Sequence, residues 1–215
     1  MAKKAERRKE KEAERKNEVD RVYNSMITFA EKKGVKLKAG KELIYRRHKE
    51  LEREIMVITI LDSMTAVMYS LHTLFGFGHE RLFKMSGGLK RILNAVASGE
   101  RSMLKLNDEI KIETGLDIKN ELFAGYSPFG GNTPEKERQQ MAAAVAGSAA
   151  SGFIPCLYVM YFYFGFKNIR LRRLAEGARE VFITNVEAGS MDEIREVLRN
   201  KCRLMISQDG KVREV

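Results

Sequence analysis

The sequence predicts a mainly α-helical protein: a multi-helix bundle with a long charged N-terminal helix and a small C-terminal β-α-β-β appendage. Only three of the 215 residues are proline, the main helix breaker, whereas 11 are methionine, a good helix former. Apolar residues recur at helical spacing from Val19 to Ile110. The pattern changes only in the last 35 residues, where β-branched residues and an Asp-Gly pair are typical of strands and a hairpin.

Residues 1–40 form the first segment, a basic charged helix and its linker. Residues 1–54 contain 18 Lys/Arg and 11 Asp/Glu, which gives +7 of the net +10. An excess of this kind indicates an acidic partner, either nucleic acid or an anionic membrane surface. A solvated charged helix with no partner is the alternative, because Lys and Glu alternate throughout it.

Residues 41–131 form the second segment, a helical core. A helix that begins near Lys41 becomes apolar on nearly every face, which is typical of the middle of a fold. Asp62 and His72 within it disfavour a membrane span. A corner follows, because glycine permits the positive φ that a tight turn requires, and phenylalanines fill the core there. The predicted corner residues are Phe75, Gly76, Phe77, Gly78 and Arg81.

Two further helices are predicted after this corner, ending at Gly99 and Gly115, since glycine favours helix C-termini. Residues 116–131 read as a loop.

Residues 132–178 contain a run of 26 residues, 141–166, without a formal charge. Three interpretations remain open. The run is a buried hairpin bent at residues 152–155, a membrane helix with Arg170, Arg172 and Arg173 as its cytosolic anchor, or an Ala/Gly-rich oligomer interface.

Residues 179–215 are predicted to begin with a strand at 181–186, because that stretch is β-branched. Ser190 and Glu193 predict a capping box, which opens a helix that ends near Cys202. Asp209-Gly210 predicts a hairpin between two short strands.

No residue set predicts catalysis. The Phe-Gly-Phe-Gly break has no lysine at P-loop spacing. His79-Glu80 begins like a zinc-protease motif, but Phe83 stands where the second histidine is needed. Cys156 and Cys202 lack both disulfide-framework and zinc spacing. The prediction is therefore a protein without enzymatic activity, metal or cofactor. No signal peptide precedes the charged start, which predicts a cytoplasmic location, with membrane association as the alternative.

Nucleic-acid binding is predicted from basic side chains that would follow a phosphate backbone without reading its sequence. The predicted binding residues are Lys3, Lys4, Arg7, Arg8, Lys9, Lys11, Arg15, Lys16, Arg46 and Arg47. A protein partner or a second copy of the chain are the other predicted partners.

One block of the sequence consists of Leu71, His72, residues 75–78, Arg81 and Leu82. A second block follows it, with Glu113-Thr114-Gly115, Asp117 and Ile118. This pattern, LH-x-x-FGFG-x-x-RL with a later ETG-x-DI, resembles that of uncharacterised small helical proteins of bacteriophages and prophages. The resemblance covers about 50 residues and ends near Asn120. It implies a host-cell cytoplasm and host or phage partners, and it carries no established activity.

Overall fold

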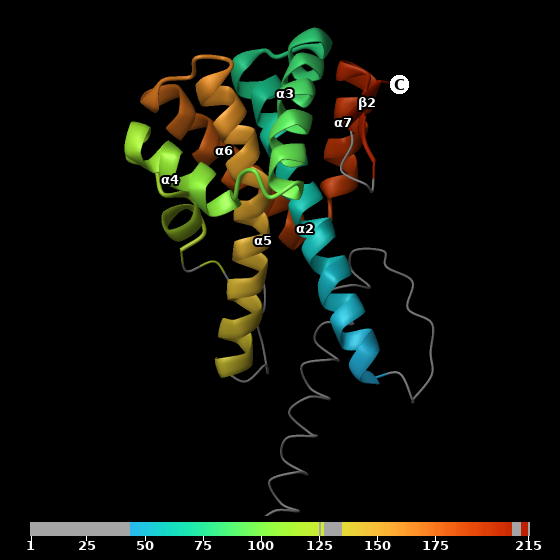
Figure 1. Ribbon diagram of the computed structural model, residues 1–215. Coiled ribbons are helices and arrows are strands. Elements are labelled where there is room, and N and C mark those ends of the chain that lie inside the picture. Colours follow the sequence, from blue (N-terminus) through green and yellow to red (C-terminus); the bar gives the residue numbers. More distant parts are fainter. Residues whose placement is uncertain (1–43, 125, 127–134, 208–211, 215) are drawn as a thin grey trace, which may run out of the picture.

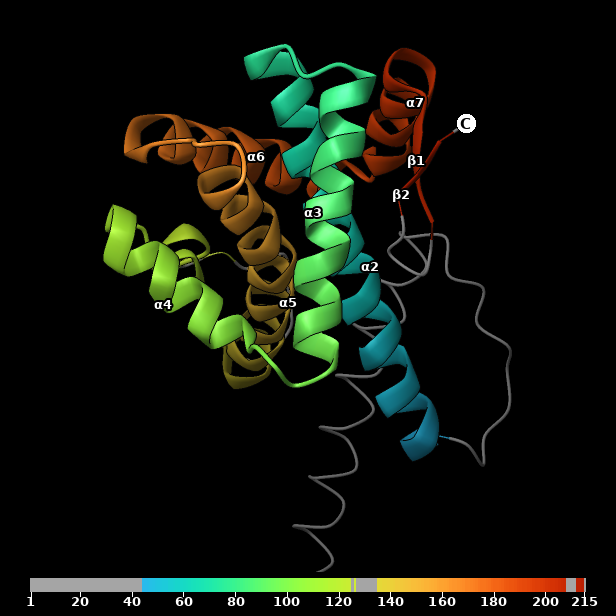
Figure 2. The same cartoon turned by 45° about the horizontal axis from the view of Figure 1, so that its top comes forward.

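The two longest helices, α2 (Ile44–Phe75) and α5 (Glu135–Phe162), lie side by side and run in the same direction (Figures 1 and 2). The computed structural model describes residues 44–124, 126, 135–207 and 212–214. The other elements are α3 (His79–Ala97), α4 (Met103–Thr114), a π-helical turn η2 (Ile118–Leu122), α6 (Asn168–Ala188), α7 (Met191–Cys202), β1 (Leu204–Ile206) and β2 (Val212–Glu214). The mainly α-helical class is confirmed, with strands only near the C-terminus in the described part.

The core forms around α2 and α5 because both helices are apolar on nearly every face and must be covered on all sides. Helices α3 and α4 pack on α5, whereas α6 and α7 pack on α2. Met68 of α2 and Leu157 of α5 are completely buried at the centre. One hydrophobic cluster runs from Ile55 to Leu204 and includes residues of every described helix.

Close contact between the long helices depends on Gly152. A Cβ atom at this position would lie 2.1 Å from Ser63 Oγ and 2.6 Å from the carbonyl oxygen of Ile60. Only a residue without a side chain lets the two backbones approach this closely.

The predicted bend at residues 152–155 is wrong, because α5 continues through Pro155 to Phe162 without a break. Proline costs about 3 kcal/mol in a helix interior. Residues 152–160 are all buried, however, and complete burial of one large apolar side chain contributes about 1.5–3 kcal/mol. Packing around this part of α5 therefore outweighs the local preference of Pro155.

The predicted strand at 181–186 is also wrong, because these residues form the last third of α6. Ala178, Phe182 and Val186 follow one another at four-residue spacing and are all buried. Valine and isoleucine disfavour a helix by less than about 0.7 kcal/mol each. The helical spacing of buried side chains therefore decides the structure here.

The C-terminal hairpin is confirmed by the antiparallel pairing of β1 and β2, in which Leu204 lies opposite Glu214. The predicted turn residues Asp209 and Gly210 lie outside the described residues. The helix that ends at Cys202 is confirmed as α7, but its predicted capping box does not form. Instead, the Ser190 hydroxyl donates to Asn185 Oδ1 at 2.7 Å.

Two helical segments, Arg53–Phe75 and Ala142–Phe162, are long and apolar enough to cross a membrane. Within their most apolar stretches, 67% and 72% of the residues are buried inside the protein. A core helix of a soluble protein has the same length and composition, so these two segments are weak evidence for a membrane location.

Candidate functional site

Both long helices end in the same Phe-Gly-Phe turn. Gly76 follows α2 with φ of 63°, and Gly165 follows α5 with φ of 66°. The amide of Phe77 donates to the Leu71 carbonyl at 3.1 Å, and the amide of Phe166 donates to the Met160 carbonyl at 3.0 Å. In both turns this bond joins residues six apart, and a left-handed glycine follows the helix, as is common at helix C-termini. The sequence therefore builds one corner twice.

The first of these corners was predicted and is confirmed, since α2 ends at Phe75 and α3 begins at His79. One detail differs from the prediction. Gly78 has φ of −85° and ψ of −173°, an extended conformation open to any residue, so only Gly76 uses the freedom of glycine.

The two corners, residues 75–78 and 164–167, meet at one end of the molecule, and we call them together the double corner. The ring centroids of Phe75 and Phe166 are 5.0 Å apart, and those of Phe77 and Phe164 are 5.7 Å apart. Phe77 and Phe166 also pack edge to face at 6.0 Å, and each is only 4% exposed. These four rings hold the two corners in a fixed position.

Arginine side chains lie over this ring cluster. Arg81 Cζ is 5.5 Å from the Phe77 centroid, and Arg170 Cζ is 5.5 Å from the Phe166 centroid. Arg173 Cζ lies 5.7 Å from Phe75. A cation over an aromatic face is stabilised by roughly 0.5–1 kcal/mol at exposed sites. The rings therefore restrict where the guanidinium groups lie while leaving their N–H groups toward solvent.

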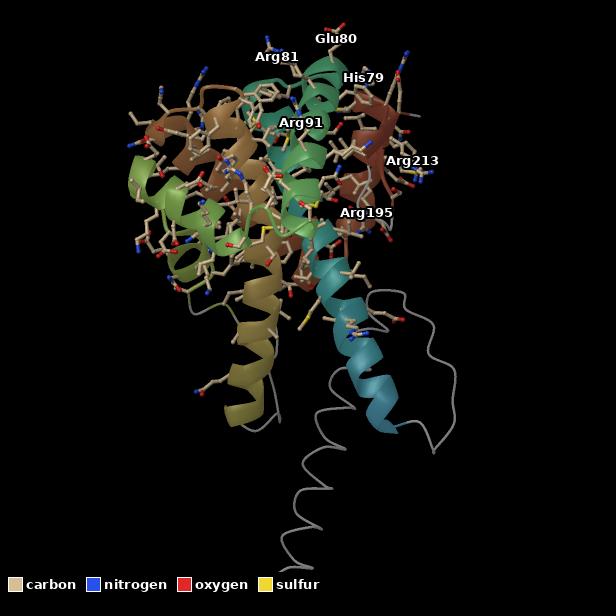
Figure 3. All side chains as sticks on the ribbon, viewed as in Figure 1. His79, Glu80, Arg81, Arg91, Arg195 and Arg213 are labelled. Carbon is tan, nitrogen blue, oxygen red and sulfur yellow. The ribbon has the colours of Figure 1, made fainter. Side chains whose placement is uncertain are left out.

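No ion pair joins these three arginines to a carboxylate among the described residues. Figure 3 shows Arg81 extending from the upper end of the molecule, with Glu80 beside it and Arg91 lower on α3. The double corner thus presents cations that are available to an anionic partner.

The charge around the double corner differs from that of the surrounding protein. Residues 76–91 and 165–180 contain nine Lys/Arg and three Asp/Glu, a net charge of +6. The whole of residues 55–215 has 21 Lys/Arg and 18 Asp/Glu, a net of +3, so the part outside the corner segments carries −3. The basic residues of the two segments are Arg81, Lys84, Lys90, Arg91, Lys167, Arg170, Arg172, Arg173 and Arg179.

Exposed apolar side chains gather at the same end. Half of the ten large hydrophobic residues that are exposed in the described part lie within residues 74–83 and 162–169. They are Leu74, Phe83, Phe162, Tyr163 and Ile169, the last of which is 85% exposed. The surface therefore combines positive charge with apolar area.

The predicted N-terminal binding residues, from Lys3 to Lys16, lie outside the described residues. Arg46 and Arg47 lie near the start of α2, in a part whose side chains the structure does not describe. Of the predicted site residues, Arg81 alone contributes a described cation to the double corner. The sequence signal for Arg170 and Arg173 was the second Phe-Gly-Phe, which lies inside the run interpreted as a hairpin or a membrane helix.

The histidines beside the first corner have structural contacts. His72 Nδ1 lies 3.0 Å from the Phe77 carbonyl oxygen. His79 Nδ1 lies 2.8 Å from the Cys202 carbonyl oxygen, and its Nε2 lies 3.2 Å from a Glu214 carboxylate oxygen. His79 thus connects α3 to α7 and to the C-terminal hairpin.

Two polar clusters elsewhere have their hydrogen bonds satisfied internally. Arg101 Nη1 donates to Tyr158 Oη at 2.7 Å, and Tyr158 Oη donates to Glu109 at 2.8 Å. In the second cluster, burial raises the pKa of Asp117, but hydrogen bonds from Lys111, Asn120 and Asn107 outweigh it and hold that pKa below its usual range.

Both clusters fix the position of α4, since the first ties it to α5 and the second ties it to η2. Within the described ranges, no three His, Cys, Asp or Glu side chains are grouped as metal ligands would be.

Comparison with known proteins does not assign the double corner. No family model, curated protein or solved structure matches the chain. The site must therefore be interpreted from its own chemistry.

Proposed function

We propose that the chain is a non-enzymatic, phage-type helical interaction protein that binds nucleic acid. The observation that carries this proposal is the concentration of nine basic side chains against three acidic ones within residues 76–91 and 165–180, the segments that begin at the double corner. Phosphate contacts from Lys and Arg supply most of the sequence-independent affinity of nucleic-acid-binding proteins. The phage-type character rests on the LH-x-x-FGFG-x-x-RL pattern alone.

The basic N-terminal residues, from Lys3 to Lys16, belong to the same proposal. Residues 1–54 carry a net charge of +7, and the corner segments add +6. An anionic partner that contacts both regions would neutralise more phosphates than either region alone, and its binding would be correspondingly more sensitive to salt.

The test is fluorescence anisotropy of the full chain with a labelled DNA duplex, the matching single strand and an RNA of the same length, at 50 to 200 mM salt. We expect binding to at least one of these, with an affinity that falls steeply as salt rises. Deletion of residues 1–21 should reduce the salt slope without abolishing binding. Absence of binding to all three probes at 50 mM salt would refute the proposal.

Membrane association is the second candidate function, and the two segments long and apolar enough to cross a membrane favour it. Flotation of the full chain with vesicles of mixed anionic and neutral lipid, together with cell fractionation, tests it. Recovery of the chain in the soluble fraction without detergent would eliminate a membrane anchor. A host or phage protein partner would be detected by affinity purification from infected cells, and self-association by light scattering.

A further inference from the structure

The chain contains an internal repeat, which appears when residues 69–88 are compared with residues 158–177. At a constant offset of 89 residues, seven positions in this stretch are identical. They are Tyr69/Tyr158, Phe75/Phe164, Gly76/Gly165, Phe77/Phe166, Arg81/Arg170, Leu82/Leu171 and Gly88/Gly177. The match continues at an offset of 88, where Ser102-Met103 corresponds to Ser190-Met191.

The structure follows this repeat beyond the matching residues. Met103 and Met191 each open a helix of 12 residues. Each of these helices ends in a left-handed residue, Gly115 with φ of 69° and Arg203 with φ of 53°. The order α2, α3, α4 is therefore repeated as α5, α6, α7.

The two halves are related by an approximate two-fold axis. Helices α3 and α4 of the first half pack on α5 of the second, and α6 and α7 of the second half pack on α2 of the first. The ring contact between Phe75 and Phe166 becomes that between Phe164 and Phe77 when the halves are exchanged, and both contacts are present. Exchange of the halves thus reproduces these main contacts, although the contact of α5 with α6 has no counterpart of similar extent between α2 and α3.

The position of the axis follows from residues that touch their own equivalents, since only residues beside a two-fold axis can do so. Ser63 and Gly152, which differ by 89, lie against each other where α2 and α5 meet, because a Cβ atom at Gly152 would be 2.1 Å from Ser63 Oγ. Phe77 and Phe166 are also equivalent, and their rings lie 6.0 Å apart. The axis therefore runs along the parallel helices α2 and α5 and leaves the molecule through the double corner (Figures 1 and 2).

The basic residues of α3 follow the same symmetry, because three of its four basic residues have basic equivalents in α6. These pairs are Arg81/Arg170, Lys84/Arg173 and Lys90/Arg179. Arg81 and Arg170 lie each 5.5 Å from rings that are 6.0 Å apart, so their guanidinium carbons are at most 17 Å from each other. This upper limit exceeds the width of the major groove, about 12 Å, so the structure allows one arginine on each side of such a groove.

We infer that the double corner binds double-stranded nucleic acid, with the internal two-fold axis on a local dyad of the duplex and with Arg81 and Arg170 on phosphates of opposite strands. This inference rests on the proposed function. The two antiparallel strands of a duplex are themselves related by two-fold axes, and two-fold proteins bind duplexes with the axes aligned. A single strand has no such symmetry.

The burial of the two rings beneath Arg81 and Arg170 favours the same ligand, and two of the exposed rings at this end are also covered, since Phe83 stacks on His79 and Tyr163 lies under Arg91. Proteins that bind single strands without sequence preference stack bases on exposed aromatic side chains. Phe77 and Phe166 are each 4% exposed and carry an arginine over the ring, so they have no face to offer a base. The guanidinium groups instead present N–H donors, which suit the oxygens of a phosphate.

The experiment compares Arg81→Ala, Arg170→Ala and the double variant in the full chain, with Lys105→Ala as the control. Lys105 is an exposed residue of α4, beyond the far end of α3, which is about 27 Å long. Affinity for a 20-base-pair DNA duplex and for its single strand is measured by anisotropy between 50 and 200 mM salt. Circular dichroism checks the fold of each variant, and Arg81→Lys and Arg170→Lys retain the charge if an alanine variant unfolds.

Each lost phosphate contact reduces the salt slope by about 0.9, which corresponds to roughly an eight-fold loss of affinity at 0.1 M salt. We expect about this loss from Arg81→Ala and about the same from Arg170→Ala, roughly 60-fold from the double variant, and less than two-fold from Lys105→Ala. The duplex should bind more tightly than the single strand. Hydroxyl-radical cleavage of the two labelled strands should give protection patterns that mirror each other about one point.

Three results would overturn the inference. The first is that the single strand binds as tightly as the duplex. The second is that replacing one arginine lowers the affinity for the duplex while replacing its equivalent does not. The third is that binding to anionic vesicles depends on the same two arginines while duplex binding does not. In the first two results, nucleic acid still binds and the proposed function survives. Absence of binding to any nucleic acid would refute both.

Discussion

The contact between Ser63 and Gly152 leads to a quantitative prediction for Gly152→Ala. The added methyl group would lie 2.6 Å from the Ile60 carbonyl oxygen, about 0.8 Å inside the 3.4 Å at which ordinary van der Waals contact begins. The hydroxyl of Ser63 can rotate away, but a backbone carbonyl in the middle of α2 cannot. Helices α2 and α5 must therefore move apart where they touch, and overpacking of this kind typically costs about 1–3 kcal/mol.

Gly147→Ala is the matched control, because Gly147 lies in the same helix and has no atom within 4 Å of its added Cβ. Replacement of glycine by alanine inside a helix stabilises it by about 1 kcal/mol. Gly147→Ala should therefore raise the free energy of unfolding by this amount. Gly152→Ala has the same favourable contribution, but the overpacking cost is subtracted from it. The two variants should therefore differ by about 1–3 kcal/mol in the free energy of unfolding.

Urea unfolding followed by circular dichroism at 222 nm measures this difference. In a chain of this size, 2 kcal/mol corresponds to a shift in Tm of about 4–8 °C. The reasoning fails if Gly152→Ala is as stable as Gly147→Ala, since the helices would then not be in contact at this point. A second variant, Ser63→Gly with Gly152→Ser, exchanges the two equivalent residues. It should recover part of the stability that Gly152→Ser alone loses, because the internal two-fold axis makes the two positions alike.

Three other predictions concern single residues. Asp117→Asn should lower the free energy of unfolding by about 1.5–3 kcal/mol at pH 7, because the carboxylate accepts hydrogen bonds that include one from a charged lysine. The pKa of Asp117 in the folded state lies below its usual 3.8, so its stabilisation is present above that pH and is lost as the pH falls through the folded value. The difference in free energy of unfolding between wild type and variant, measured by urea unfolding, should accordingly become smaller below pH 4. A difference that does not change with pH would contradict this. Gly76→Ala should lower the free energy of unfolding by about 1–2 kcal/mol, because Gly76 has a positive φ. Gly78→Ala should lower it much less, because Gly78 is extended and has open space around an added Cβ atom. Equal decreases in Tm for the two variants would contradict the assignment of the turn. Burial raises the pKa of the Cys156 thiol to about 12, so a thiol reagent at pH 8 should label Cys156 only at the rate of unfolding, and rapid labelling of the native protein would be inconsistent with its position.

Helix boundaries set by glycine could be predicted from the sequence. The break after Phe75 and the end of α4 at Gly115 depend on local backbone conformations that few residues other than glycine adopt. Such a preference acts within one turn and needs no knowledge of the rest of the fold. The C-terminal hairpin was predictable from another local signal, an Asp-Gly pair between two short stretches typical of strands.

The failures occurred where packing opposes local preference. Pro155 disfavours a helix, and the β-branched stretch 181–186 favours a strand, yet both lie within helices. In each case the surrounding side chains are buried by helices that are distant in the sequence. The stabilisation from this burial exceeds the free-energy cost of placing these residues in a helix. Such contributions are known only once the partners of each helix are known.

The binding surface could be predicted only in part. Arg81 belonged to the predicted corner, but Arg170 and Arg173 received a role only in the membrane alternative for residues 141–166, as its cytosolic anchor. The contact of Arg173 with Phe75 joins residues 98 positions apart. The contact of Arg170 with Phe166 depends on where α5 ends. Two copies of Phe-Gly-Phe at a fixed offset were the sequence signal that would have brought these arginines together with Arg81.

The exchange of helices between the two halves has a consequence for synthesis of the protein on the ribosome. Helix α2 is covered mainly by α5, α6 and α7, all of which lie after residue 134. A nascent chain that ends at residue 124 has therefore made α2 but none of these three helices. At about 5–20 residues per second, the remaining 91 residues take roughly 5–18 s. Until α5 and α6 are made within this interval, Arg53–Phe75 is an uncovered apolar segment of membrane-spanning length. The cell must keep it from aggregation and from the membrane until the second half emerges.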